Sequence, residues 1–233
     1  RTSDIVMPAN IPNFNGISGS VYMNAGQIEN KGIEIQVSAT PFKGEFSWET
    51  TLSWSKNNNK ILSLANNQNQ LANAKAGTKW SNVIRNYVGR PMGDMYMLKV
   101  IGTFNTEEDL AKYATNGTQG IGDLIFEDYK KDGTIDVNDY QLVGNYQPDF
   151  TFGWNNTFKY KDLDLAITID GQCGGNVIYA AARAFSLNRY DDNVLAESGL
   201  GRWISPTNTG NGTSHKAGTN NLGSNIGPST RYL

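Results

Sequence analysis

The chain has 233 residues, a formal net charge of −2 and a hydrophobic content of 38%. The small negative charge argues against a basic nucleic-acid-binding surface, and no run of about 18 apolar residues is present that could form a membrane-spanning helix. Cys173 is the only cysteine, which excludes an intrachain disulfide. His215 is the only histidine, which removes histidine-based metal clusters, and its polar surroundings predict that it is solvated.

Four segments alternate between apolar and polar side chains, which is the pattern of β-strands with two different faces. They lie in two hairpins, 30–56 and 150–172, and every charged residue of the alternating runs is on the polar face. Thr50 and Asn156 are the only polar residues on the other face. The apolar residues are Ile33, Ile35, Val37, Ala39, Phe46, Trp48, Leu52, Trp54, Phe150, Phe152, Trp154, Phe158, Tyr160, Leu163, Leu165, Ile167 and Ile169.

The connections between these strands alternate between short and long. Residues 41–45 and 161–162 make two short turns, whereas 57–149 and 173–233 are long and polar. Outer-membrane barrels have short periplasmic turns, long extracellular loops, strands of about 10 residues and aromatic girdles at the membrane interfaces. The pattern therefore favours an all-β fold, an antiparallel transmembrane β-barrel with long extracellular loops, over a secreted β-sandwich with moderate loops at both ends.

The long segments are expected to carry short helices. Thr106 and Asp109 have the spacing of a capping box, and Glu108 and Lys112 form an i,i+4 pair. Three consecutive alanines predict a second helix over about 177–187. Four loop residues could stack on or pair with a sugar or peptide, but they are expected to fill the core of the loops, and no residue is assigned to the substrate: Trp80, Tyr96, Arg202 and Trp203.

The segment 128–139 has the layout of an EF-hand-type calcium loop of twelve residues. Carboxylates stand at positions 1, 5, 9 and 12, glycine at position 6, and the position-7 residue offers a backbone carbonyl. Lys130 at position 3 and an aspartate at position 12 depart from the pattern, and an acidic surface turn is the alternative interpretation. The expected calcium ligands are Asp128, Asp132, Thr134, Asp136 and Asp139.

The order of segments along the chain resembles the C-terminal part of the barrel in the SusC/RagA-type TonB-dependent outer-membrane transporters of Bacteroidetes. The resemblance covers nearly the whole chain in the same order. The stretches that carry it are Arg1–Ile5, Ala25–Glu34, Val88–Gly93, Gly122–Asp128, Val143–Asn145, Pro148–Gly153, Gly175–Tyr179, Arg202–Trp203 and Arg231–Leu233.

The resemblance implies a barrel of about 22 strands in the cell outer membrane, closed by an N-terminal plug. It also implies import of oligosaccharides or peptides together with a SusD-like surface lipoprotein, with energy supplied by the TonB complex. The two helices would then be struts within the loops or contacts with the lipoprotein or ligand. Because four strands cannot close a barrel, the sequence is expected to be a piece of a longer chain.

Two other classes of function are alternatives to the one that this resemblance implies. A secreted calcium-binding β-sandwich that binds glycans would need an apolar core between two sheets. An enzyme has little support, because the sequence has no nucleophile elbow, no metal-site histidines and no phosphate-binding glycine loop. The chain is therefore expected to supply barrel wall and loops and no catalytic chemistry.

Overall fold

A computed structural model describes residues 1–10, 20–64, 69–76, 80–185, 193–218 and 227–233. The chain divides into two compact units. The first contains Arg1–Leu71, Asn86–Gly93 and Asn145–Asn176, and the second contains Ala72–Arg85, Asp94–Gly144 and Val177–Leu233. Within the described ranges, no helix has both the length and the apolar character needed to cross a membrane.

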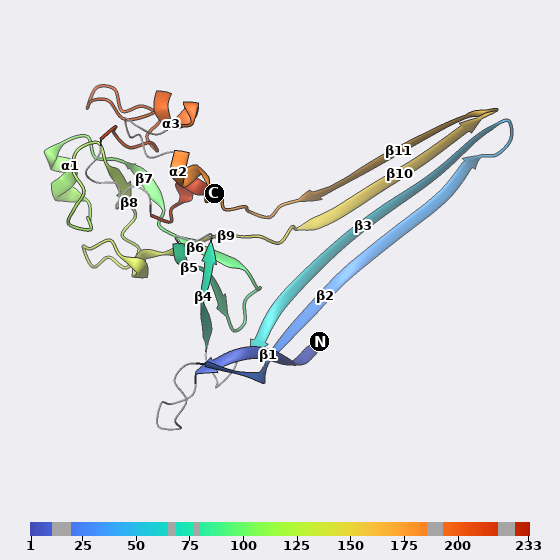
Figure 1. Cartoon of the computed structure of the whole chain (residues 1–233), viewed down its shortest axis with the longest axis horizontal. Helices are drawn as coiled ribbons and strands as arrows, with labels where there is room; N and C mark the ends of the chain where they lie inside the picture. The colour runs from blue at the N-terminus through green and yellow to red at the C-terminus, as the bar shows by residue number, and fades with distance from the viewer. Residues whose placement is uncertain (11–19, 65–68, 77–79, 186–192, 219–226) are drawn as a thin grey trace. The chain divides into compact units, whose positions relative to one another are not determined.

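The first unit is built on a five-stranded antiparallel sheet in the order β1-β2-β3-β10-β11 (Figure 1). The register is unbroken between β3, β10 and β11, and between β2 and β3 it is unbroken from Ile28 to Ala39. The strands of both predicted hairpins are present. β2 and β3 are longer than the alternation indicated, so the first hairpin extends well beyond 30–56. The strand bounds are Thr2–Asn10, Ser20–Phe42, Phe46–Ser63, Phe150–Tyr160 and Leu163–Cys173.

Both short turns lie at the same end of this sheet. Phe46, the first residue of β3, pairs with Tyr160, the last residue of β10. Since each of these residues adjoins its own turn, the two turns must be neighbours, as the paired tips in Figure 1 show. Lys161 adopts a positive φ of 53° in the second turn, as tight hairpin turns require. The predicted hairpin topology is confirmed.

The apolar face of the four long strands is exposed. Leu52 is 52% exposed and Leu165 is 57% exposed, and Ile35, Phe152, Trp154 and Ile167 are also exposed. Trp48 and Trp54 are half-buried by neighbours on the same face. The core of a sandwich would shield these side chains from solvent, so their exposure agrees with an outward-facing barrel wall.

Aromatic rings gather beside the short turns on this face. Trp48 stacks on Phe158 with ring centroids 5.7 Å apart, and Phe46 stacks on the same ring at 6.3 Å. Phe42, which lies beyond the predicted alternation, stacks on Trp48 at 6.1 Å. A band of aromatic side chains at one end of an apolar face is the arrangement found where barrel strands meet a membrane interface.

The two polar residues on the apolar face are hydrogen-bonded to tryptophans. Thr50 and Asn156 lie directly opposite each other on β3 and β10. The indole N–H of Trp48 donates to Asn156 Oδ1 at 3.1 Å, and that of Trp154 donates to Thr50 Oγ1 at 2.9 Å. Asn156 is only 4% exposed. The two hydrogen bonds give Thr50 and Asn156 each a polar partner on a face that is otherwise apolar.

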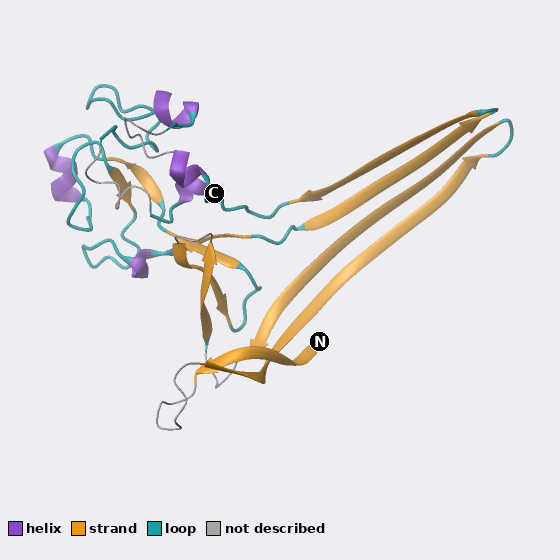
Figure 2. Cartoon of the chain, in the orientation of Figure 1, coloured by secondary structure: helices purple, strands orange, loops and turns teal. Residues whose placement is uncertain are grey.

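The second unit contains two small sheets. One has the order β4-β5-β6-β9, and the other pairs β7 with β8. The helices of the described chain all belong to this unit (Figure 2). The strands of the first sheet are β4 (Gln70–Ala76), β5 (Trp80–Tyr87), β6 (Asp94–Met97) and β9 (Gln141–Asn145). Those of the second are β7 (Val100–Thr103) and β8 (Leu124–Phe126). The helices are α1 (Glu107–Lys112), α2 (Ala182–Phe185), α3 (Ala196–Leu200), η3 (Val137–Asp139) and η4 (Thr230–Tyr232).

The segment 57–149 therefore holds more regular structure than sequence patterns indicated. The helix after Thr106 is confirmed, together with both hydrogen bonds of its capping box. The second predicted helix is shorter, since α2 spans Ala182–Phe185 and residues 186–187 lie outside the described chain. Six strands of this segment, β4 to β9, were not predicted, because they are short and lack a sustained two-residue period.

Two hydrophobic clusters form the core of the second unit. Trp80, Val83, Met97 and Tyr232 make one cluster, in which the Trp80 and Tyr232 rings lie 5.0 Å apart. The other contains Leu98, Leu124, Phe126 and Ile135. Trp80 thus fills the core of the loops, as expected.

We predict that Trp48→Phe destabilises the intact receptor by about 1–2 kcal/mol, because the substitution leaves the Asn156 carbonyl without its donor. Trp54→Phe is the matched control: Trp54 lies on the same face, and its indole forms no hydrogen bond with the described residues. Guanidinium unfolding in lipid vesicles, followed by circular dichroism, measures the loss of stability in both variants. Equal losses would contradict the assigned role of the indole, whereas Asn156→Leu in the Trp48→Phe background should recover stability.

Candidate functional site

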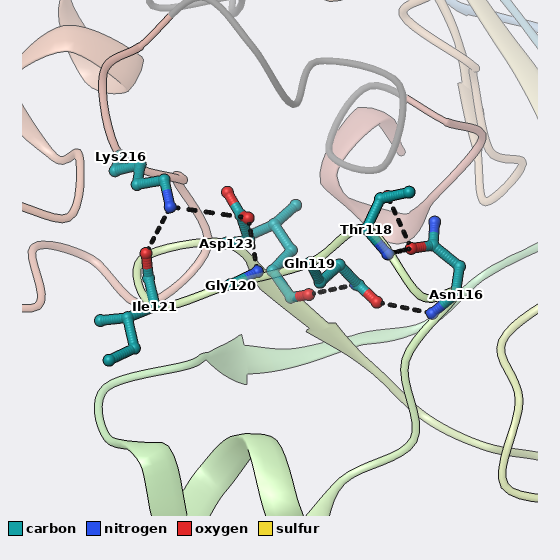
Figure 3. A network of polar contacts seen from close by, with 8 residues as sticks. Asn116, Thr118, Gln119, Gly120, Ile121, Asp123 and Lys216 are labelled. Carbon is teal, nitrogen blue, oxygen red and sulfur yellow. Dashed lines mark hydrogen bonds and ion pairs between the residues drawn. The ribbon is translucent and has the colours of Figure 1, made fainter.

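The stretch Gly122–Asp128 leads into the acidic loop, and both belong to the second unit. Asp123 is almost fully buried, and its Oδ2 accepts a hydrogen bond from the Gly120 N–H at 2.8 Å (Figure 3). Lys216 Nζ lies 3.7 Å from the same oxygen and donates to the Ile121 carbonyl at 2.5 Å. The Lys216 N–H donates to the Gly122 carbonyl at 2.8 Å. A buried charge is stable when it is paired and hydrogen-bonded, so these contacts fasten two distant segments together.

Gly122 is required by both its conformation and its surroundings. Its φ is +85°, in the region that favours glycine. A Cβ at this position would lie 2.7 Å from the Trp203 ring and 2.8 Å from the Lys216 side chain. The Trp203 indole N–H also donates to Asn105 Oδ1 at 2.9 Å. Trp203 is therefore a packing residue of the loops, in agreement with the expectation that it fills their own core.

The end of this stretch leads directly into the acidic loop. Leu124, Ile125 and Phe126 are buried in β8. Glu127 forms an ion pair with Lys99 at 2.9 Å and accepts a hydrogen bond from Gln141 Nε2 at 3.1 Å. The hydrogen bond from Lys99 and the one from Gln141 hold the pKa of the Glu127 carboxyl below its usual range.

The acidic loop is folded around the carboxylate of its first residue. Asp128 Oδ1 accepts from the N–H groups of Lys131 and Asp132, at 2.6 and 3.2 Å, and Oδ2 accepts from Gly133 at 2.9 Å. Gly133 has a φ of +81°, which accounts for glycine at position 6. Ile135 at position 8 is buried in the second hydrophobic cluster and ties the loop to the unit.

The last carboxylate closes the loop in the same way. Asp139 is fully buried; its Oδ1 accepts from the Lys130 N–H at 3.1 Å and its Oδ2 from the Asp136 N–H at 2.9 Å. Asp132 and Asp136 each accept from an N–H two residues further on, those of Thr134 and Asn138. Every predicted carboxylate ligand therefore accepts at least one backbone hydrogen bond.

The predicted ligands do not converge on one point. Among the described residues, no group of three or more His, Cys, Asp or Glu side chains is arranged so that it could hold a metal ion. Lys130 forms no ion pair with the described carboxylates either, so the alternative in which its ammonium replaces calcium is also not seen. The oxygen donors suit calcium in chemistry, but this structure does not gather them. Calcium binding by the loop stays a prediction.

A buried polar cluster that sequence reasoning missed lies around His215. The prediction that His215 is solvated is wrong, since the side chain is only 2% exposed. Arg231 Nη1 lies 2.8 Å from His215 Nδ1, and Arg231 Nη2 donates to Ser198 Oγ at 3.2 Å. Burial lowers the pKa of the Arg231 guanidinium from its ordinary value. No local pattern could have found this cluster, because its residues come from three separated segments.

The polar face of the first unit forms a hollowed wall. Gln36, Ser53, Gly153 and Asp170 lie in one row across four strands. A hollow of about 480 Å³ lies over this row, and Glu34 and Asp170 are among the residues that line it. The sheet therefore presents a polar, acidic concave surface on one side and an apolar surface on the other.

Known proteins similar to this chain are TonB-dependent receptors. Two from Formosa agariphila are 29% identical over 200 residues and 27% identical over 183 residues, matching 84% and 76% of this chain and 20% and 18% of their own lengths. The TonB-dependent receptor SusC of Bacteroides thetaiotaomicron is 23% identical over 225 residues, which are 88% of this chain and 21% of SusC. No model of a protein family matches. The chain spans about a fifth of the length of these curated relatives.

The fold is similar to that of solved transporters. The structure of the RagAB peptide transporter aligns with this chain at a TM-score of 0.64 and 16% sequence identity. The alignment covers 93% of this chain and 23% of the transporter chain. These matches confirm the resemblance to SusC/RagA-type TonB-dependent receptors and the fold class, a fragment of an all-β antiparallel barrel. The expectation that the chain is not an enzyme is confirmed as well, because the matched relatives are receptors.

We predict that Gly122→Ala loosens the second unit far more than Gly117→Ala. Both glycines have a φ above +80°, but a Cβ at Gly117 would meet nothing within 4 Å. Overpacking at Gly122 should therefore add about 1–3 kcal/mol to a backbone cost that the two substitutions share. Hydrogen exchange of the Lys216 amide in the intact receptor measures the difference, and equal exchange in the two variants would contradict the packing argument.

We predict that calcium, where it binds the acidic loop, slows cleavage of residues 128–139 by a protease, because the ion would offset repulsion among four carboxylates. Proteolysis of the intact receptor with and without EGTA, together with calcium analysis by mass spectrometry, gives the answer. Asp132→Asn is the test variant and Glu108→Gln, on exposed α1, is the charge-matched control. Unchanged cleavage with no calcium detected would reject the metal site.

Proposed function

We propose that this chain is a wall and loop segment of a SusC/RagA-type importer in the cell outer membrane. The observation that carries the proposal is the two-faced sheet of the first unit, whose exposed apolar face continues across four strands in register. The opposite, polar face would line the lumen, and the apolar face would contact the lipid bilayer. The similarity to TonB-dependent receptors supports the same conclusion.

The whole protein would import oligosaccharides or peptides with energy from the TonB complex. The relative SusC and the RagAB peptide transporter are the basis for this part of the proposal. A SusD-like surface lipoprotein would be the partner, and the second unit, which is rich in loops, would supply surface for contact with the partner or the substrate. The acidic loop would stabilise that unit, with calcium as its expected ion.

The secreted sandwich, the competing function, has less support. It needs an apolar core between facing sheets, whereas Ile35, Leu52 and Leu165 on the apolar face are exposed. The apolar face also carries an aromatic band at the end where the short turns lie, which a sandwich core has no reason to place there.

We predict that Leu52→Arg prevents stable assembly in the outer membrane and that Ser53→Arg does not. The two residues are neighbours on β3, but Leu52 lies on the apolar face and Ser53 on the polar face near Asp170. An arginine in the lipid-facing midplane costs about 2–4 kcal/mol, whereas a lumen-facing arginine stays hydrated. The measurement is the amount of heat-modifiable, folded receptor in isolated outer membranes, with wild type beside the two variants.

Equal assembly of the two variants would contradict a lipid-facing surface on β3. Transport is tested separately by the uptake of labelled oligosaccharides and peptides in cells with and without a functional TonB. Uptake that persists without TonB would contradict the proposed energy source, and co-purification of a surface lipoprotein with the receptor tests the partner.

A further inference from the structure

Three lysines lie on the long strands of the first unit, at the end of the sheet that is remote from the short turns. Lys31 is on β2, and Lys56 and Lys60 are on β3. All three side chains are exposed. They lie beyond Ile33 and Trp54, the residues at which the two alternating runs end on this side. The sheet therefore continues past its apolar face as a surface that carries lysines.

The strand register places the three lysines on the same face as the apolar residues. Three successive rows of this face pair residues of β2 and β3 directly opposite each other: Ile33 with Lys56, Lys31 with Asn58, and Glu29 with Lys60. Because side chains alternate with a period of two and the register is unbroken here, these rows lie on the same side as Trp54. The lysines thus extend the face that is expected to meet lipid.

The opposite face carries no charge along the same stretch of β2 and β3. Its residues there are asparagines and a glycine: Asn30, Gly32, Asn57 and Asn59. Above a membrane both faces would be hydrated, so solubility alone gives no reason to place all the lysines on one side. A partner that meets only the outward face gives such a reason.

The distance from the short turns to the lysines matches one membrane thickness. At about 3.3 Å per residue and a strand tilt of about 40°, β3 rises by roughly 25 Å from Phe46 to Lys56, which is the height of the apolar band of outer-membrane barrels. The aromatic band beside the short turns marks one edge of the apolar face, and Lys56 marks the other. Since short turns are periplasmic in such barrels, the lysines would lie at the outer leaflet.

The three side chains are close enough to share one anion. Lys31 is the diagonal neighbour of both Lys56 and Lys60, and such neighbours lie about 7–8 Å apart, within reach of long side chains. Glu29 forms an ion pair with Lys31 at 2.9 Å. Among the described residues, Lys56 and Lys60 form no ion pair. One carboxylate beside three lysines leaves the surface with an excess of positive charge.

We propose that Lys31, Lys56 and Lys60 bind the phosphate group of an anionic lipid in the outer leaflet. The acyl chains would lie along the exposed apolar face below Lys56, and the phosphate would lie among the ammonium groups, which bind phosphate as point charges. Lysines at a membrane surface attract anionic lipids in this way. The inference rests on the outer-membrane location in the proposed function, but it concerns the surrounding lipid and not the transported substrate.

The test is native mass spectrometry of the intact, detergent-purified receptor, titrated with monophosphoryl lipid A. We expect the double variant Lys56→Gln with Lys60→Gln to raise the Kd of this lipid at least about tenfold, because each lysine contributes to the attraction. The double variant Lys56→Arg with Lys60→Arg keeps both charges and should bind like wild type. Both lysines are exposed, so neither pair of substitutions should prevent folding.

The matched control is the double variant Lys43→Gln with Lys161→Gln. It removes the same charge from two exposed lysines, which lie in the short turns at the other end of the sheet. Its affinity for the lipid should equal that of wild type. An equal rise in Kd in the control, or no rise in the Lys56 and Lys60 variant, overturns the proposal.

Two further probes identify the group that the lysines recognise. Dephosphorylated lipid A should bind more weakly than the phosphorylated lipid, and inorganic phosphate should bind more weakly still. Equal binding of the dephosphorylated lipid would assign the contact to the apolar face alone. Inorganic phosphate that binds as tightly as the lipid would make the surface a site for the free ion. Either result overturns the proposal.

The proposed function can fail or survive independently of this lipid site. Folded receptor in isolated outer membranes, with a lipid affinity that does not depend on the lysines, would retain the importer and reject the site. Conversely, lipid binding that depends on Lys56 and Lys60 in a protein absent from outer membranes would retain the phosphate-binding surface and reject the importer.

Discussion

The common register of four paired strands is the constraint on which the first unit depends. Because side chains alternate with a period of two, all side chains of one row across the sheet lie on the same face, either the apolar or the polar one. Val37, Leu52, Trp154 and Ile169 form one row, and the next row contains Gln36, Ser53 and Asp170. A slip of one residue on any strand would exchange these faces. In the proposed outer-membrane setting the slip would place carboxylates in hydrocarbon, so the bilayer would enforce the register.

Thr50 and Asn156 show how such a surface tolerates exceptions. Thr50 and Asn156 lie opposite each other on β3 and β10, and each accepts a hydrogen bond from an indole N–H of the other strand. Trp154 donates to Thr50, and Trp48 donates to Asn156. The bonds cross, so each strand supplies one donor and one acceptor to the other. This pairing is possible only in the observed register, because a shift would separate each indole from its acceptor. The exceptions to the apolar pattern therefore add to the specificity of strand pairing.

Sequence reasoning succeeded where the pattern is long and local, and it failed where contacts are distant. The four long strands have a period that extends over about ten residues each, and the capping box at Thr106 is complete within four residues. β4 to β9 are shorter, and packing decides their structure more than propensity does. His215 was misjudged for the same reason: its burial depends on Arg231 and on a fold that brings α3 close to both. The acidic loop could be located, but the hydrogen bonds of its carboxylates could not be predicted, and its calcium binding stays a prediction.

The stretch Gly122–Asp128 shows how one short sequence can meet several physical requirements in succession. Gly122 leaves room for Trp203 and Lys216, Asp123 fastens the segment to Lys216, and Asp128 gathers three backbone N–H groups at the start of the acidic loop. None of these contacts requires a ligand, so the stretch is explained by the stability of the second unit alone. Tyr179 and Glu197 differ, since both are exposed and neither belongs to the clusters around Trp80 and Leu124. Exposed side chains of the second unit can therefore vary without a change in its hydrophobic clusters, which is the property that a recognition loop on a fixed scaffold needs.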